Sequence, residues 1–181
     1  IGVNGSAFDY GTGKPSPLGM CIKNGIIYGD YMTSYSVMAV KKDGTIYTPA
    51  QGLMGKNLLA AGVKDTYNFG PILIKDGEAQ LPWAETEKYY PRTAVGMVKP
   101  NDYVLLVTDT GSYNGLNHWD MVNIFKSYGC TYAYNLDGGG SATLYFNGKV
   151  MNKLIGNTQR PCADFLYFTR SVSYTHLTLP T

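Results

Sequence analysis

The sequence predicts an α+β domain built on a mixed, mainly antiparallel sheet, and three observations lead to this fold class. The 181 residues include 22 glycines and 16 tyrosines, a composition typical of turn-rich β structure with aromatic surfaces. Strand-length apolar runs are separated by short turn signals, so most neighbouring strands are joined by hairpins. Only one stretch has a clear helical period, and with 44% hydrophobic residues the chain can bury a core.

The expected strands follow one another through hairpin signals. Asp43-Gly44 is a two-residue turn between two apolar runs, and Asp76-Gly77 reverses the chain in the same way. The run at 102–108 is almost continuously apolar, which predicts a strand buried on both faces. The predicted strands are residues 1–4, 19–23, 36–41, 45–48, 69–75, 92–98, 102–108, 131–136, 143–146 and 163–169.

One helix is predicted over residues 117–128, and a second, shorter one over 53–62. Apolar side chains recur at helical spacing at Met121, Ile124, Phe125 and Tyr128. Asn117 can cap the longer helix, with Asp120 three residues further on, and Gly129 is placed to end it.

The charge balance argues against polyanionic partners. Fifteen Lys and Arg residues against thirteen Asp and Glu give a net charge of +2. This charge is too near neutral for a surface that binds nucleic acids or membranes. No run approaches the roughly 20 apolar residues that a membrane helix needs, so we expect no membrane insertion in this segment.

The length fits one domain, which we place at residues 1–170. Because the chain enters a strand directly at Ile1, we expect this domain to be N-terminally truncated. Residues 171–181 resemble the translation of a sequencing adapter and are set aside as a non-native tail, the alternative being a genuine final strand. Without His176 in that tail, His118 is the only histidine, which disfavours a Ser-His-Asp triad or a two-His metal site.

The cysteines fit neither a small disulfide framework nor a metal knuckle, because they are few and widely spaced. We expect Cys21, Cys130 and Cys162 to act as buried small hydrophobic residues. One disulfide plus one free thiol is the alternative.

The segment Asn135-Leu-Asp-Gly-Gly-Gly-Ser141 is the outstanding candidate for a functional site. Three consecutive glycines cost more backbone entropy than an ordinary turn requires, and their N–H groups can approach a ligand closely. An anion is the natural ligand for such a loop, although a merely flexible turn is the alternative. The spacing of a nucleotide-hydrolase phosphate loop is missing, and no Lys follows the glycines.

Further polar side chains lie at predicted strand ends, where functional sites tend to collect. Arg92, followed by Thr93, can grip a phosphate or carboxylate with two hydrogen bonds, or form an edge-strand salt bridge. Asn4, Asp9 and Asp109 are also delivered at strand ends, and the two aspartates could equally be turn formers that accept local backbone N–H groups.

Taken together, these segments resemble the phosphodiester glycosidase family, in order and approximate spacing, from residue 1 to about 170. Two departures are Ser6-Ala7, where the family often has Gly-Phe, and Thr110, which separates Asp109 from the glycine that usually follows it directly. The segments that carry the resemblance are Val3-Asn4-Gly5 with Phe8-Asp9, Phe69-Gly70-Pro71 with Asp76-Gly77, Arg92-Thr93-Ala94-Val95-Gly96, the strand ending at Asp109, and residues 135–141.

The resemblance implies hydrolysis of a sugar whose anomeric carbon is linked to a phosphodiester. Asp137 is then the first choice for the carboxylate that acts at the anomeric carbon, with Asp109 and Asp9 as second choices. Arg92 and the loop 138–141 would stabilise the departing phosphate, so we expect them to share one cleft. The expected phosphate- and substrate-binding residues are Asn4, Arg92, Thr93, Asn135, Gly138, Gly139, Gly140 and Ser141.

The resemblance also sets expectations for the substrate and the location. N-acetylglucosamine is the expected sugar, Tyr113, Trp83 and Tyr145 are candidates to stack on a sugar ring, and a bacterial, secreted or cell-surface protein is expected. No cofactor is required by this reaction.

Two other functions remain open at this stage. The domain could be a glycan-binding module of the cell surface without turnover, for which the departures at Ser6 and Ala7 leave room. It could also be a metal-dependent phosphodiesterase in which Asp9, Asp109 and Asp137 converge on a divalent cation such as Mg²⁺, Ca²⁺ or Mn²⁺.

Overall fold

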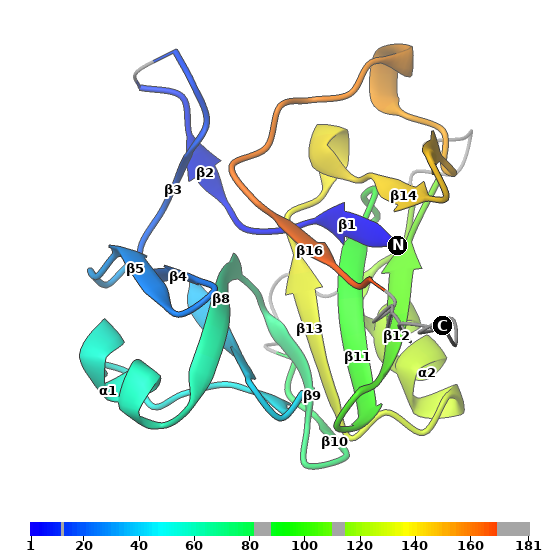
Figure 1. The fold of residues 1–181 in the computed structure, drawn as a ribbon. Coiled ribbons are helices and arrows are strands. Elements are labelled where there is room, and N and C mark those ends of the chain that lie inside the picture. The colour runs from blue at the N-terminus through cyan, green and yellow to red at the C-terminus, as the bar shows by residue number, and fades with distance from the viewer. Residues whose placement is uncertain (12, 82–87, 110–114, 170–181) are drawn as a thin grey trace, which may run out of the picture.

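The computed structural model describes residues 1–11, 13–81, 88–109 and 115–169, and its strand pairings are antiparallel. The predicted tail therefore lies outside the described residues. At the centre is a five-stranded sheet in the order β10-β9-β13-β11-β12 (Figure 1). Its strands are β9 (Ile72–Lys75), β10 (Glu78–Ala79), β11 (Thr93–Lys99), β12 (Asp102–Val107) and β13 (Tyr132–Leu136).

A four-stranded sheet, in the order β15-β14-β1-β16, joins the two ends of the domain. The N-terminal strand is central, because Val3 pairs with Leu144 on one side and with Leu166 on the other. The strands are β1 (Gly2–Asn4), β14 (Leu144–Phe146), β15 (Lys149–Val150) and β16 (Phe165–Tyr167).

The remaining strands form a three-stranded sheet, in the order β7-β6-β8, and two separate hairpins. The sheet consists of β6 (Ser36–Lys41), β7 (Ile46–Tyr47) and β8 (Val63–Phe69). The hairpins pair β2 (Phe8–Asp9) with β3 (Ser16–Pro17), and β4 (Cys21–Lys23) with β5 (Ile26–Gly29).

Both predicted helices are confirmed, as α1 (Gly55–Ala60) and α2 (His118–Ser127). Asn117 caps α2 through a reciprocal capping box with Asp120, as the sequence predicted. Two short 3₁₀ turns follow later in the chain, η1 (Gly139–Ser141) and η2 (Ile155–Asn157). None of the described helices is long and apolar enough to cross a membrane.

The five-stranded sheet has a hydrophobic core on each face. Helix α2 covers one face, where Phe125 packs with Ala94 and Ala133. On the other face, Val95 and Leu136 pack against Val3 and other residues of the two smaller sheets. Neighbouring residues of β11 and β13 therefore contribute to different cores, as the period of two in a strand requires.

Two strand predictions need correction. The strand predicted over 69–75 is two strands, because β8 ends at Phe69 and β9 begins at Ile72 after the Gly70-Pro71 step. The sequence analysis also missed most of β8. The strand at 102–108, predicted to be buried on both faces, is only half-buried as β12, because it lies at the edge of its sheet.

All three cysteines are free thiols, and the expectation that they are buried holds for two of them. Cys21 and Cys130 are buried, whereas Cys162 is half-buried. Burial raises the pKa of each thiol, and Lys23 opposes this effect at Cys21.

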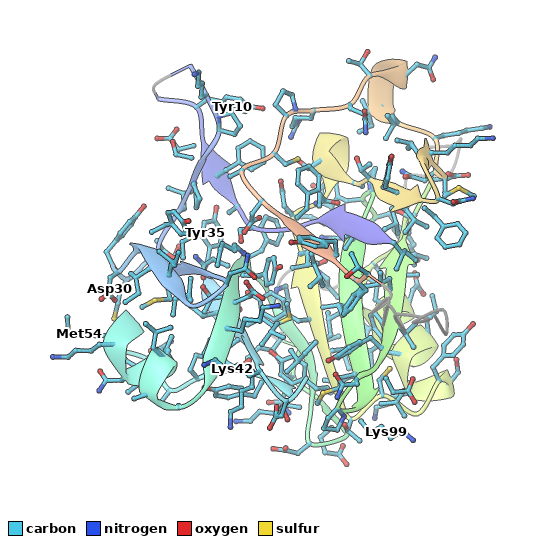
Figure 2. All side chains as sticks on the ribbon, viewed as in Figure 1. Tyr10, Asp30, Tyr35, Lys42, Met54 and Lys99 are labelled. Atoms are coloured by element: carbon cyan, nitrogen blue, oxygen red, sulfur yellow. The ribbon has the colours of Figure 1, made fainter. Side chains whose placement is uncertain are left out.

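The contact between α2 and β11 depends on the absence of a side chain at Gly96. A Cβ atom there would lie 2.5 Å from the Phe125 ring and 2.7 Å from the Cys130 Sγ. We expect Gly96→Ala to lower the free energy of unfolding by about 1–3 kcal/mol, as overpacked core sites do. Urea denaturation measures this, with Lys99→Ala on the exposed end of the same strand as the control (Figure 2). Equal stability of the two variants would contradict this packing.

Candidate active site

Most of the predicted site residues lie at one end of the strands of the five-stranded sheet, whereas Asp9 lies in the separate β2–β3 hairpin. Figure 1 shows that β12 and β13 end on the side of the sheet where β11 begins. Thr93 pairs with Val107 on one side and with Leu136 on the other, so Arg92, Asp109 and Asp137 lie just beyond this row.

The two faces of the sheet divide these residues into two groups. Thr93 and Leu136 lie on the face covered by β1, whereas Arg92 and Asn135 alternate with them and belong to the face covered by α2. The side chains of Arg92 and Thr93 therefore leave the chain on opposite faces of the sheet. The predicted grip of the Arg92 guanidinium on a phosphate stays a prediction.

Asn4 is a fully buried hub on the β1 face. Its Oδ1 accepts hydrogen bonds from the Thr93 hydroxyl (2.7 Å) and the Thr143 N–H (3.1 Å). Its Nδ2 donates to the backbone oxygen of Asp137 (2.5 Å), and the Asp137 N–H donates to the Gly5 oxygen (3.0 Å). With both amide atoms engaged, Asn4 positions the Asp137 loop rather than facing a ligand.

Asp137 is half-buried at the start of the glycine loop. Burial raises the pKa of its carboxyl, opposed by hydrogen bonds from Ser141 and from the Gly138 N–H and by the charge of Arg160. The nearby Asp164 also raises it. A carboxyl with a raised pKa beside a cation is a common feature of catalytic sites.

The glycine loop is folded into the η1 turn, and three of its N–H groups have acceptors within the protein. Gly138 donates to the Asp137 carboxylate (2.9 Å), Gly139 to the Pro91 oxygen (2.8 Å) and Ser141 to the Gly138 oxygen (3.0 Å). A Cβ atom on Gly138 would lie 2.5 Å from the same Pro91 oxygen. Close packing on the Pro91 backbone thus accounts for at least one of the three glycines.

Arg160 contacts this loop with its guanidinium, and the sequence analysis missed it. Its Nη1 lies 3.5 Å from the Ser141 Oγ, and its guanidinium occupies the space that a side chain on Gly140 would need. The Tyr10 hydroxyl holds the following residue by donating to the Pro161 oxygen (2.6 Å). Figure 1 shows the segment between η2 and β16 curving past η1. In the sequence, Arg160 is marked only by the proline that follows it and by the strand predicted shortly after it.

Asp164 is a second buried carboxylate near the loop. It accepts hydrogen bonds from the Ser6 N–H (2.6 Å) and the Ser6 hydroxyl (2.7 Å), and it forms an ion pair with Lys23 (2.7 Å). The Lys23 ammonium also lies 3.4 Å from the centre of the Tyr67 ring. Ser6, one of the two residues that depart from the family pattern, therefore has a defined structural partner.

The Arg92 guanidinium binds backbone carbonyls on the α2 face. Its Nε donates to the Leu116 oxygen (3.1 Å) and its Nη2 to the Lys88 oxygen (3.0 Å), beside the Tyr90 ring. Its Cα lies near Gly138 of the loop. The prediction that the guanidinium and the loop amides share one cleft stays a prediction.

We expect Arg92→Lys to lower the free energy of unfolding by about 2–3 kcal/mol, because an ammonium cannot keep both charged hydrogen bonds. Chemical denaturation measures this effect. Arg160→Lys is the matched control, since Arg160 is exposed and its replacement should leave stability unchanged. An unchanged unfolding free energy in Arg92→Lys would show that these two bonds contribute nothing to stability.

Asp9 and Asp109 are exposed and accept backbone N–H groups. Asp9 binds the Gly11 N–H (3.1 Å), and Asp109 binds the Lys153 N–H (2.7 Å). The Asp9 contact fits the turn-forming interpretation, whereas Asp109 joins two segments that are distant in the sequence. Among the described residues, no group of three or more His, Cys, Asp or Glu side chains is arranged to hold a metal ion, so nothing there supports convergence of Asp9, Asp109 and Asp137.

Of the remaining candidates, Asn135 is buried on the α2 face, where its Nδ2 donates to the Gly70 oxygen (2.7 Å). Tyr145 is 49% exposed on β14. Trp83 and Tyr113 lie outside the described residues. The described part of the site thus consists of the half-buried Asp137, the buried Ser141 and the exposed Arg160. Asn4 hydrogen-bonds to the Asp137 backbone, and Asp164 lies nearby.

A family model for phosphodiester glycosidases matches residues 1–169, and the chain belongs to this family. The expected resemblance is therefore confirmed.

Individual relatives support the assignment. The chain is 30% identical to an uncharacterized protein derived from the SPbeta prophage of Bacillus subtilis, over 87% of this chain and 26% of that protein. It is 28% identical to the N-acetylglucosamine-1-phosphodiester alpha-N-acetylglucosaminidase of Mus musculus, over 82% of this chain and 32% of that enzyme. The chain spans about a quarter to a third of these relatives.

The fold is similar to that of the pro-peptide-inhibited catalytic domain of the zebrafish N-acetylglucosamine-1-phosphodiester alpha-N-acetylglucosaminidase. The TM-score is 0.70 at 24% identity, and the match covers 90% of this chain and 59% of the zebrafish chain. A hypothetical protein from Synechocystis gives a TM-score of 0.58 at 13% identity, over 89% of this chain and 50% of that one. These likenesses establish the fold class predicted from the sequence.

Proposed function

We propose that the chain carries the catalytic site of a hydrolase that cleaves a sugar from an anomeric phosphodiester, with Asp137 acting at the anomeric carbon. One observation carries the proposal. The Asp137 carboxyl, whose pKa is raised by burial, lies beside Ser141 and Arg160 at one end of the five-stranded sheet. N-acetylglucosamine is the proposed sugar, since two curated relatives are named for that activity.

In this mechanism the phosphate is the leaving group. A phosphodiester is far less basic than an alkoxide, so its departure needs charge stabilisation more than protonation. The exposed Arg160 guanidinium provides this stabilisation in our proposal, while the buried Ser141 hydroxyl donates to Asp137. The Asp137 carboxylate either attacks the anomeric carbon as the phosphate leaves, giving a glycosyl-enzyme ester that water hydrolyses to free sugar, or it takes a proton from the water that attacks the anomeric carbon directly.

The proposed reaction requires no resident metal or organic cofactor. Its test is turnover of an alpha-N-acetylglucosamine-1-phosphodiester, with and without a chelator, and with an O-linked N-acetylglucosaminide as the control substrate. We expect the phosphodiester alone to be hydrolysed, at the same rate with chelator. Loss of turnover on chelation would favour a metal-dependent reaction, and no turnover of either substrate would favour a glycan-binding module. Location at the cell surface is part of the proposal and rests on the family resemblance alone.

The rate should fall at acidic pH, because Asp137 must be ionised to act. Burial raises its pKa, so the acid limb of kcat/KM should lie above the ordinary range of an exposed Asp. Ser141 stabilises the ionised form, and we expect Ser141→Ala to move this limb to higher pH. The pH profiles of the two proteins measure the shift. A limb that stays in place or moves to lower pH would contradict the assigned hydrogen bond.

A further inference from the structure

A cleft of about 590 Å³ opens beside the Gly70-Pro71 step between β8 and β9. It is lined by residues of the segment leading into β6, of the β8–β9 connection, of the chain after β10 and of the start of α2. The loop 135–141 and the segment 158–164 contribute none of its lining residues.

His118 marks the polar end of this cleft. It is the first residue of α2, is only 4% exposed, and lines the cleft. Its Nε2 is buried and has no hydrogen-bond partner within the described part of the chain. A buried nitrogen of this kind costs about 1–3 kcal/mol when it is unpaired, so a ligand that hydrogen-bonds to it gains an advantage.

The imidazole is neutral at physiological pH. Burial, followed by the nearby charge of Arg92, lowers the pKa of His118 to about 4. Among the described residues, the others that line the cleft include no Lys, Arg, Asp or Glu. A described lining of hydroxyl, amide, aromatic and neutral imidazole groups, with no charged side chain of its own, suits an uncharged ligand that forms hydrogen bonds.

An aromatic surface forms the other side of the cleft. The Tyr35 and Phe69 rings are stacked, with centroids 5.8 Å apart and planes 9° apart. Tyr35 is 39% exposed and lies on the segment that leads into β6 (Figure 2). Ser36 and Gln80 add a hydroxyl and an amide. A flat ring surface bordered by hydroxyl, amide and imidazole groups matches the apolar face and hydroxyl rim of a pyranose.

We propose that this cleft binds a neutral sugar ring, stacked on Tyr35 and hydrogen-bonded to His118, at a site separate from Asp137. The inference does not depend on the proposed hydrolysis, since a cleft of this composition would serve a glycan-binding module equally well. In the hydrolase it would hold another unit of a longer glycan.

The test uses the complete chain with Asp137→Asn added to suppress turnover. N-acetylglucosamine and glucose are the neutral probes, and inorganic phosphate is the anionic one. The imidazole resonances of His118 are followed by ¹H–¹⁵N NMR, and a His176→Gln variant assigns the two histidines. We expect saturable shifts with at least one of the sugars and none with phosphate.

A matched pair of tyrosine variants locates the binding. Tyr35→Ala should weaken sugar binding about tenfold or more, equivalent to roughly 1.4 kcal/mol. Tyr28→Ala, at a more exposed tyrosine outside the cleft, should leave the affinity unchanged. The proposal is overturned if neither sugar gives a saturable shift, if phosphate gives one instead, or if both variants bind equally well. These binding measurements do not depend on turnover, so they test this proposal even if the chain hydrolyses no substrate.

Discussion

Replacing Asp137 by Asn should reduce the rate of sugar-phosphodiester hydrolysis by about 100-fold or more, because an amide can neither attack the anomeric carbon nor activate water. The substitution keeps the size of the side chain and leaves the backbone bonds to Asn4 and Gly5 in place. The fold should therefore survive, and KM should change little. Steady-state kinetics on the purified variant measures both parameters.

The controls are Asp9→Asn and Asp109→Asn, at the two second-choice carboxylates. Both side chains are exposed and accept a backbone N–H group, so we expect less than a few-fold change in rate. A larger loss in either control than in Asp137→Asn would move the catalytic role to that residue.

Replacing Arg160 by Ala should lower kcat/KM about 10- to 100-fold, since a charged contact to the departing phosphate is lost. Arg160→Lys should recover part of the loss, because it keeps the charge but not the fork of two donors. The loss should appear without a change in stability, since the side chain is exposed.

The comparison with Arg92→Lys separates two phosphate sites. If Arg160→Ala retains full activity and Arg92→Lys loses it beyond its effect on stability, the phosphate binds on the α2 face. In that case the proposed role of the Asp137 loop would be wrong. If both variants lose activity, thermal denaturation shows whether either variant is inactive because it is unfolded at the assay temperature.

Local sequence signals predicted much of the fold. The capping box of α2 and the Asp76-Gly77 turn are set by neighbouring residues, so they could be read directly from the chain. The predicted two-residue turn at Asp43-Gly44 was wrong in length, because the hairpin loop there spans residues 42–44. The division of residues 69–75 into β8 and β9 could not, because a continuous apolar run does not show where a strand changes sheets. The half-buried state of β12 likewise depends on its position at the sheet edge.

The candidate site was only partly predictable for a similar reason. Residues 135–141 stand out because three glycines in a row are unusual, and the structure places Asp137 among polar partners. Arg160 and Asp164 reach the loop only because β16 pairs with β1, and that long-range pairing leaves no local signal. The separation of Arg92 from Thr93 follows from strand alternation, once their common strand is known.

The position of bond cleavage tests the central claim most directly. Hydrolysis of an alpha-N-acetylglucosamine-1-phosphodiester is run in oxygen-18 water, and both products are analysed by mass spectrometry. If Asp137 acts at the anomeric carbon while phosphate departs, the label must appear in the sugar. In a metal phosphodiesterase, a cation-bound hydroxide attacks phosphorus, which places the label in the phosphate. Label in the sugar is the result we predict, and label in the phosphate would contradict the proposed mechanism.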